Sequence, residues 1–276
     1  MKKMWNVFWM ETKRTMNRIS FFLLILTVAV MCLLIPILLD DGRTMMNCLS
    51  AFWSMSKEEF GLQESLKVRS VLWQLTSGYF VMFTPMLVSF SVLPILCEEK
   101  ESGALRYMMF RSGKKQTVIG SFFACILCGG VLMAAGYLLF AGILGVHSYV
   151  LFGSAGLQTI KEVSIFVLNK TIGVFAFGMT CAVWTYLVSA FVKNRYLLVS
   201  IPYIALWFLQ RLAGNIQYEV IEEHAGVRLY VQTFGATYIF GELKYILQII
   251  AIYGVISVFI ILLHMGMLKR RTDCGM

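Results

Sequence analysis

The chain has 276 residues, of which 59% are hydrophobic and only 14% are charged, and its mean hydropathy is +0.75. Soluble domains are about 45–50% apolar and about 25% charged, so the composition excludes an ordinary soluble core. It indicates an all-α protein that crosses a lipid bilayer several times. The net charge of +9 would suggest nucleic acid as the partner of a soluble protein. Here we expect lipid, and no nucleic acid, to be the partner of the basic side chains.

Residues 1–19 are predicted to form an amphipathic helix that lies on the membrane surface. At 100° per residue, one side of this helix is apolar and holds Trp5, Phe8, Trp9, Thr12, Met16 and Ile19. The other side is polar or basic and holds Lys2, Lys3, Asn6, Lys13, Arg14 and Asn17. Aromatic residues opposite a basic face are typical of an interfacial helix.

Six apolar runs then predict six transmembrane helices, each long enough to cross about 30 Å of hydrocarbon. They cover approximately residues 21–39, 75–96, 118–144, 171–192, 196–212 and 245–268. Pro85 and Pro94 should kink the second span, because each removes one backbone hydrogen bond. The third span carries small residues that allow neighbouring helices to approach closely, namely Gly129, Gly130, Gly136 and Gly142.

Polar segments separate these spans. Residues 40–74 and 213–244 are expected outside the cytoplasm, and the pattern within residues 43–73 predicts two short helices. Residues 145–170 are predicted to be a short loop. Only three residues, 193–195, separate the fourth span from the fifth, which allows only a tight antiparallel hairpin.

The polar segment between the second and third spans, residues 97–117, has an ordered charge pattern. Its acids precede its bases, an order that complements the dipole of a short helix; they are Glu98, Glu99 and Glu101, then Arg106, Arg111, Lys114 and Lys115. Leu105, Met108 and Met109 fall at i, i+3 and i+4 and give this helix one apolar face. Gly113 is a typical stop. The pattern by itself also fits an ordinary solvated loop.

The run from Glu99 to Leu105, followed by a methionine-rich turn and a basic segment, resembles the signature of type-2 ABC transporter permeases. The match lies at Glu99, Glu101, Gly103 and Leu105. The chain departs from the family at three positions: Ala104 stands where Thr is usual, Arg106 where an acid is common, and Ser121 where Lys often begins the third span. The family's N-terminal connecting helix on the inner leaflet also resembles residues 1–19.

The resemblance implies a fold, a partner and a set of contact residues. This segment would be the cytoplasmic coupling helix, which sits in a cleft of a separate ATP-hydrolysing subunit. The contact would involve Glu98, Glu99, Glu101, Gly103, Leu105, Arg106, Met108, Met109 and Arg111. Within that set, Leu105, Met108 and Met109 would supply the buried contact, Glu99 and Glu101 the cap and charge pairing, and Gly103 a close approach. ATP and Mg²⁺ would be held by the partner and no cofactor by this chain.

The distribution of Lys and Arg predicts the orientation in the membrane. Bases concentrate on the cytoplasmic side of membrane proteins, close to the ends of the spans. Fifteen of the 24 bases lie on one side of the six-span layout: Lys2, Lys3, Lys13, Arg14, Arg18, Lys100, Arg106, Arg111, Lys114, Lys115, Lys193, Arg195, Lys269, Arg270 and Arg271. We therefore expect both termini and residues 97–117 to be cytoplasmic, in a single multi-pass domain of the cell membrane, most simply a bacterial plasma membrane.

Known catalytic and metal-binding motifs are not found in the sequence. The Gly113-Lys114-Lys115 run lacks the upstream glycine and the hydroxyl of a phosphate-binding loop, so this chain is not expected to hydrolyse ATP. The three histidines are far apart and lack zinc-ligand spacing, so no metal is expected; they are His147, His224 and His264. Cys125 and Cys128 lie inside a span and are expected to be packing residues.

The sequence favours an ATP-driven exporter, formed by two copies of the chain or by one copy and a related permease. Because the spans carry no unpaired acid, the cargo is expected to be hydrophobic or amphipathic, such as a drug, an antimicrobial peptide or a lipid. One alternative is a membrane sensor or immunity protein that transports nothing. A second is an intramembrane protease of the glutamate type, but both Glu-Glu pairs have their arginine at the wrong spacing, and one residue turns a helical side chain by 100°.

Overall fold

The computed structural model describes residues 2–38, 45–54, 71–72, 79–98, 104–152, 154–192, 194–215 and 243–273. Its helices are α1 (Lys2–Met16), α2 (Ile19–Leu34), α3 (Cys48–Ser54), α6 (Tyr79–Leu93), α8 (Ala104–Ser112), α9 (Lys114–Phe152), α10 (Ser154–Ser189), α11 (Arg195–Gly214) and α15 (Leu243–Asp273). A π-helical turn, η2 (Pro94–Glu98), follows α6. Two short strands, β1 (Pro36–Leu38) and β2 (Met45–Asn47), pair antiparallel with Ile37 opposite Met46.

Several of these helices have the length and composition of membrane spans. Within the described residues, three segments are long and apolar enough: Lys114–Val150, Ser164–Ser189 and Arg195–Ala213. α1 and α2 form a fourth candidate that is bent by 65°. Shorter apolar stretches, Phe80–Leu93 and Ala251–Met267, coincide with the predicted second and sixth spans. The structure thus supports a mainly helical membrane protein with three or four candidate spans, and the count of six stays a prediction.

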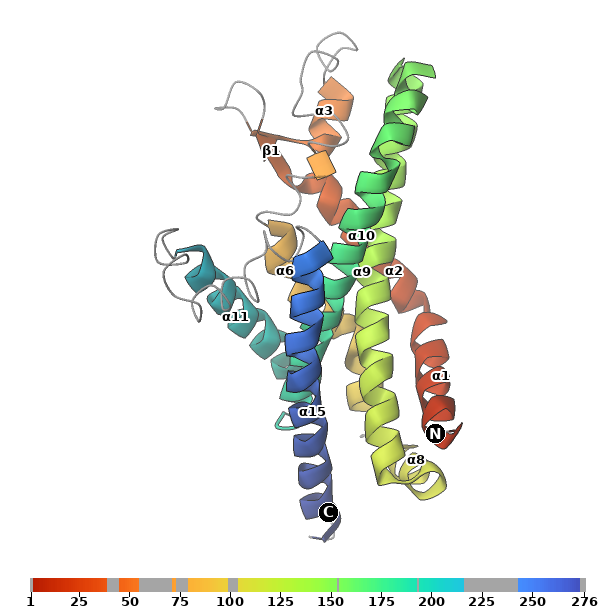
Figure 1. The fold of residues 1–276 in the computed structure, drawn as a ribbon, viewed down its shortest axis with the longest axis vertical. Coiled ribbons are helices and arrows are strands. Elements are labelled where there is room, and N and C mark those ends of the chain that lie inside the picture. The colour runs from red at the N-terminus through yellow and green to blue at the C-terminus, as the bar shows by residue number, and fades with distance from the viewer. Residues whose placement is uncertain are drawn as a thin grey trace.

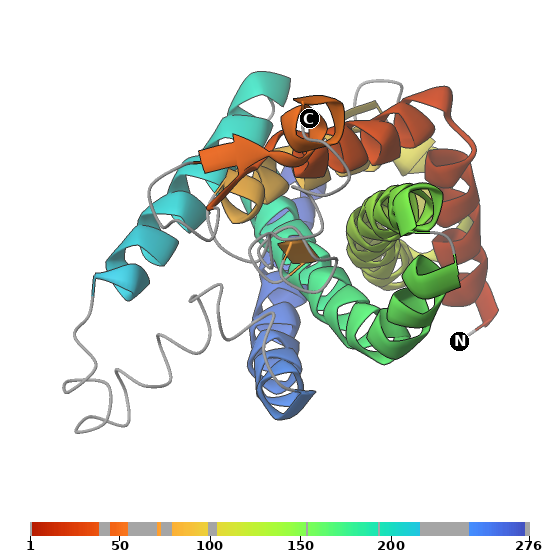
Figure 2. The ribbon, with the colours of Figure 1, turned by 90° about the horizontal axis from the view of Figure 1, so that it is seen from above.

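α9 is the central helix of the fold. It packs most extensively against α10, and α1, α2, α6 and α15 contact its other sides (Figure 1; Figure 2). The backbones of α9 and α10 come close together at Gly129 and Gly178, where a Cβ atom added to Gly178 would lie 2.5 Å from the Gly129 carbonyl oxygen. Gly136 similarly faces Val28 of α2. The predicted packing role of the third-span glycines is therefore confirmed at these positions.

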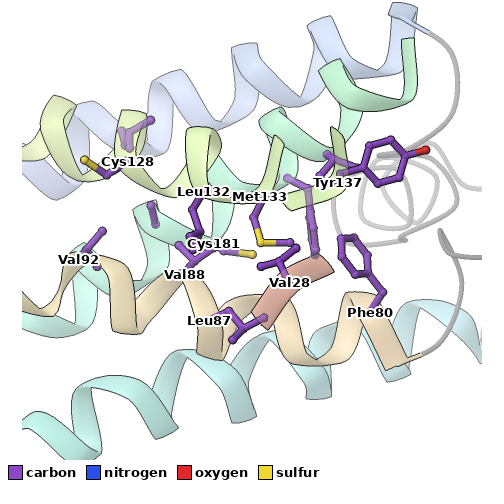
Figure 3. Packing of buried hydrophobic residues seen from close by; sticks show 14 of the residues in the cluster. Val28, Phe80, Leu87, Val88, Val92, Cys128, Leu132, Met133, Tyr137 and Cys181 are labelled. Atoms are coloured by element: carbon purple, nitrogen blue, oxygen red, sulfur yellow. The ribbon is translucent and has the colours of Figure 1, made fainter. Parts of the chain in front are cut away.

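One core connects the helices around α9. Buried side chains from α2, α6, α9 and α10 interdigitate in it, including Val28, Val88, Leu132, Met133 and Cys181 (Figure 3). Cys125 and Cys128 are buried within this core and form no disulfide, as expected for packing residues.

Two helix boundaries differ from the predicted ones. α2 ends at Leu34, before the predicted limit at residue 39, because Pro36 disfavours the helical conformation of the preceding residue and Ile35 is extended. Residues 145–152 and 154–170, predicted as part of a loop, are helical, because the segment contains no proline and continues α9 and α10. With 39 residues α9 is about 58 Å long, nearly twice the thickness of the hydrocarbon.

The connection between α10 and α11 is short, as the sequence predicts, but it begins at residue 190 and not at residue 193. α10 ends at Ser189 and α11 begins at Arg195. The Asn194 side chain caps α11 by accepting a hydrogen bond of 2.9 Å from the Tyr196 amide. Most of the two predicted extracytoplasmic segments, including residues 55–70 and 216–242, lies outside the described residues.

α1 is helical as predicted, and it packs on α9 mainly through residues that the sequence analysis did not single out. It lies lengthwise against the first part of α9 (Figure 1). Val7, Glu11 and Thr15 are buried there, while Trp5 and Trp9 are exposed. A helical wheel groups residues by polarity and cannot show that a polar strip packs against another helix. The position of α1 on a membrane surface stays a prediction.

Replacing Gly178 by alanine should destabilise the protein, because the new methyl group would press on the Gly129 backbone. Overpacking of this kind costs about 1–3 kcal/mol, or about 2–12 °C in melting temperature. Gly142→Ala is the matched control, since nothing lies within 4 Å of its added Cβ. Thermal unfolding of the two purified variants in one detergent measures the difference. Equal melting temperatures would contradict the close α9–α10 contact.

Candidate functional site

The predicted coupling helix exists as α8, a nine-residue helix between η2 and α9. It lies at the end of the molecule that also holds the start of α1 and the end of α15, opposite α3 and β1 (Figure 1). α8 contacts both α9 and α1. The start of α1, the end of α15 and α8 therefore lie at one end of the molecule, and the cytoplasmic location of this end stays a prediction.

A glycine turn fixes the angle between α8 and α9. Gly113 has φ +92°, a conformation that side chains disfavour, and its amide donates to the Met109 carbonyl at 2.9 Å. The Thr117 amide and hydroxyl both donate to the Gly113 carbonyl, at 3.1 and 3.0 Å. The same hydroxyl lies 3.4 Å from the Met108 carbonyl oxygen. The stop predicted at Gly113 is confirmed, and it attaches α8 firmly to the start of the central helix.

The exposed side of α8 is not the predicted apolar face. Met108 and Met109 are half-buried against the body of the protein. Tyr107 and Phe110, one turn apart, are 80% and 91% exposed. We call Tyr107 and Phe110 the aromatic pair. The spacing of Leu105, Met108 and Met109 identified an apolar stripe, but it could not show that the protein itself covers the two methionines.

The other predicted contact residues divide into two groups. Arg111 is exposed next to the aromatic pair. Glu99, Glu101 and Gly103 lie outside the described residues, as do the side chains of Glu98, Leu105 and Arg106. The structure therefore brings Arg111 together with Tyr107 and Phe110, two residues that the sequence analysis missed. The sequence did carry a signal for them, since two aromatic residues spaced three positions apart lie on one side of a helix.

A buried polar junction links α9, α10 and α15 close to the attachment of α8. The Tyr186 hydroxyl donates to the Val118 carbonyl at 3.2 Å, and Val118 directly follows Thr117. The Tyr186 carbonyl accepts from Ser189 Oγ at 2.7 Å and lies 2.8 Å from His264 Nε2. A carbonyl oxygen only accepts, so Nε2 of His264 carries the proton in this contact. The junction connects the start of the central helix to the last helix of the chain.

The described residues contain no group of three or more His, Cys, Asp or Glu side chains that could hold a metal ion. His264 is buried against Tyr186, with the ring centroids 4.3 Å apart. Within the described residues, this end of the molecule exposes hydrophobic and basic side chains. Its buried polar groups form hydrogen bonds that join helices to one another.

Two comparisons with known proteins found no relative of this chain. No family model matches the chain, and no curated protein is significantly similar to it. The resemblance to type-2 ABC permeases consequently rests on the residues and the layout described above.

Replacing Gly113 by valine should loosen α8 from α9. A β-branched residue at positive φ costs about 1–2 kcal/mol, which corresponds to about 5–30-fold more frequent local opening. Trypsin cleavage after the exposed Arg111 should accelerate by this factor. Gly266→Val on α15 is the control, since nothing lies within 4 Å of its added Cβ. Unchanged cleavage in Gly113→Val would show that the turn does not hold the helix.

Proposed function

We propose that this chain is the membrane-spanning subunit of an ATP-driven transporter of the type-2 ABC class. In this proposal the chain spans the cell membrane six times, with both termini and α8 in the cytoplasm. A separate subunit docks on α8 and hydrolyses ATP with Mg²⁺. Two copies of the chain, or one copy and a related permease, enclose the pathway. The cargo is hydrophobic or amphipathic, and the direction is export.

The exposed aromatic pair on α8 is the observation that carries the proposal. Two large aromatic side chains side by side on a nine-residue helix form an apolar patch that calls for a partner. Arg111, Lys114 and Lys115 follow the patch closely in sequence and are exposed. Their charges disfavour a position inside the hydrocarbon and favour the cytoplasmic side. The patch therefore suits a protein partner better than lipid tails.

The attachment of α8 supports a mechanical role. Gly113 and Thr117 fix α8 to α9, so a partner that moves α8 also moves the start of the central helix. α9 contacts most of the other helices, and Tyr186 adds a connection to α15 through His264. ATP binding can shift the permease between two conformations only if the ATPase contacts α8 differently in each of them. α8 is suited to such a contact, because it is short, is fixed to α9 and exposes the aromatic pair.

Phe110→Asp should remove the bound ATPase. A buried aromatic at the centre of an interface contributes at least about 2 kcal/mol, so the affinity should fall about 30-fold or more. The tagged chain would be purified in mild detergent from the cells that naturally produce it, and ATP hydrolysis by the purified material would be measured. Wild type should carry ATPase activity and Phe110→Asp should lose it.

Trp53→Asp is the matched control for this experiment. Trp53 is also 91% exposed, but it lies on α3 at the opposite end of the molecule (Figure 1). This variant should retain the wild-type ATPase activity. Folded wild-type protein without any ATPase activity would contradict the proposal and favour a membrane sensor. Equal losses in both variants would show that the effect is not specific to α8.

A further inference from the structure

The contact between α1 and α9 encloses an acid that no described group neutralises. Glu11 is 0% exposed, and neither of its carboxylate oxygens has a hydrogen-bond partner. The basic residues closest to it in sequence, Lys13 and Arg14, are exposed, and neither donates a hydrogen bond to it. An ionised carboxylate without a counter-charge is among the most costly groups to bury. If Glu11 is ionised, a positive group from outside the described residues must accompany it.

Three hydroxyl groups in the same contact also lack partners. Thr12 and Thr15 of α1 and Ser121 of α9 are each more than nine-tenths buried. None of their oxygens has a hydrogen-bond partner by distance and angle, although the Cys128 thiol lies beside Thr15. Glu11, Thr12 and Thr15 share one side of α1 because they are spaced i, i+1 and i+4. Five side-chain oxygens without partners therefore lie on the two helices that meet here.

The packing register places Glu11, Thr12 and Thr15 beside the stretch of α9 between Ser121 and Cys128. Val7 packs against Gly120, and Thr15 lies beside the Cys128 thiol. The two pairs are eight residues apart on both helices (15 − 7 and 128 − 120), so α1 and α9 run parallel in constant register. Glu11 is midway on α1 and lies within about one helical turn of Ser121 and Cys128 on α9. It is close enough to Cys128 to interact with the thiol electrostatically.

We propose that the α1–α9 contact binds one dehydrated monovalent metal cation between the Glu11 carboxylate and the hydroxyls of Thr12 and Thr15, on the side of α1 that faces α9. Hard cations take oxygen ligands, and the unpartnered groups all supply oxygen. A single carboxylate balances a single positive charge, whereas a divalent ion would keep an uncompensated charge in a dry environment. Among the described residues no group of three His, Cys, Asp or Glu side chains offers a site for a transition metal.

The bound cation would fasten α1 to the central helix at the end of the molecule that carries α8. Gly120 allows the close approach that this requires, since a Cβ there would lie 2.9 Å from a Val7 methyl carbon. The site is defined by burial and charge alone, so it does not depend on the transport proposal.

The test is the thermal stability of the purified full-length protein in detergent. Na⁺, K⁺ and the bulky cation N-methyl-D-glucamine would be compared as chloride salts at constant ionic strength. Wild type should be stabilised by Na⁺, by K⁺ or by both, with a rise of about 5–10 °C when the cation reaches 100 times its dissociation constant. N-methyl-D-glucamine should give no rise.

Two variants and a control locate the site. Glu11→Gln removes the charge at constant shape, so its melting temperature should be the same in all three salts. Thr15→Val removes one ligand and should shift the midpoint of the cation titration several-fold higher. Lys13→Gln, on the exposed side of α1, should keep the wild-type response. A wild-type melting temperature that is equal in all three salts would overturn the proposal, as would a wild-type cation response in both Glu11→Gln and Thr15→Val. If Glu11→Gln does not fold, Thr15→Val alone decides.

Discussion

The close contact between the α9 and α10 backbones at Gly129 and Gly178 is the constraint on which the rest of the structure depends. Lipid tails are as apolar as the helices, so helices associate in a membrane through close packing and hydrogen bonds. Without side chains at these two positions, α9 and α10 can lie together over a long stretch. The other sides of α9 then remain available for α1, α2, α6 and α15.

This arrangement gives α8 its mechanical position. α9 begins immediately after the Gly113 turn, so the helix at the centre of the fold is also the helix to which α8 is attached. The hydrogen bond from Tyr186 to Val118 joins α10 to α9 within a few residues of this turn, and His264 adds α15. A partner bound to the aromatic pair would thus act on several helices through these hydrogen bonds.

The sequence predicted the features that local chemistry controls, and it failed where tertiary packing decides. The stop at Gly113 and the short connection before Arg195 were correct, because a glycine after a helix and a connection of few residues permit few conformations. The exposed side of α8 was not identified, since an apolar stripe at Met108 and Met109 can face either the protein or a partner. Similarly, residue-type periodicity assigned no buried role to Glu11, because only the position of α9 makes that side of α1 an interior.

The most direct test of the central claim is site-specific photocrosslinking from α8. Phe110 would be replaced by p-benzoylphenylalanine, and the cells that naturally produce the protein would be irradiated before their membranes are solubilised. The account predicts a covalent product with a nucleotide-hydrolysing protein at position 110 and none with the same probe at position 53. Crosslinks from position 110 to lipid alone, or to the same protein from both positions, would contradict it.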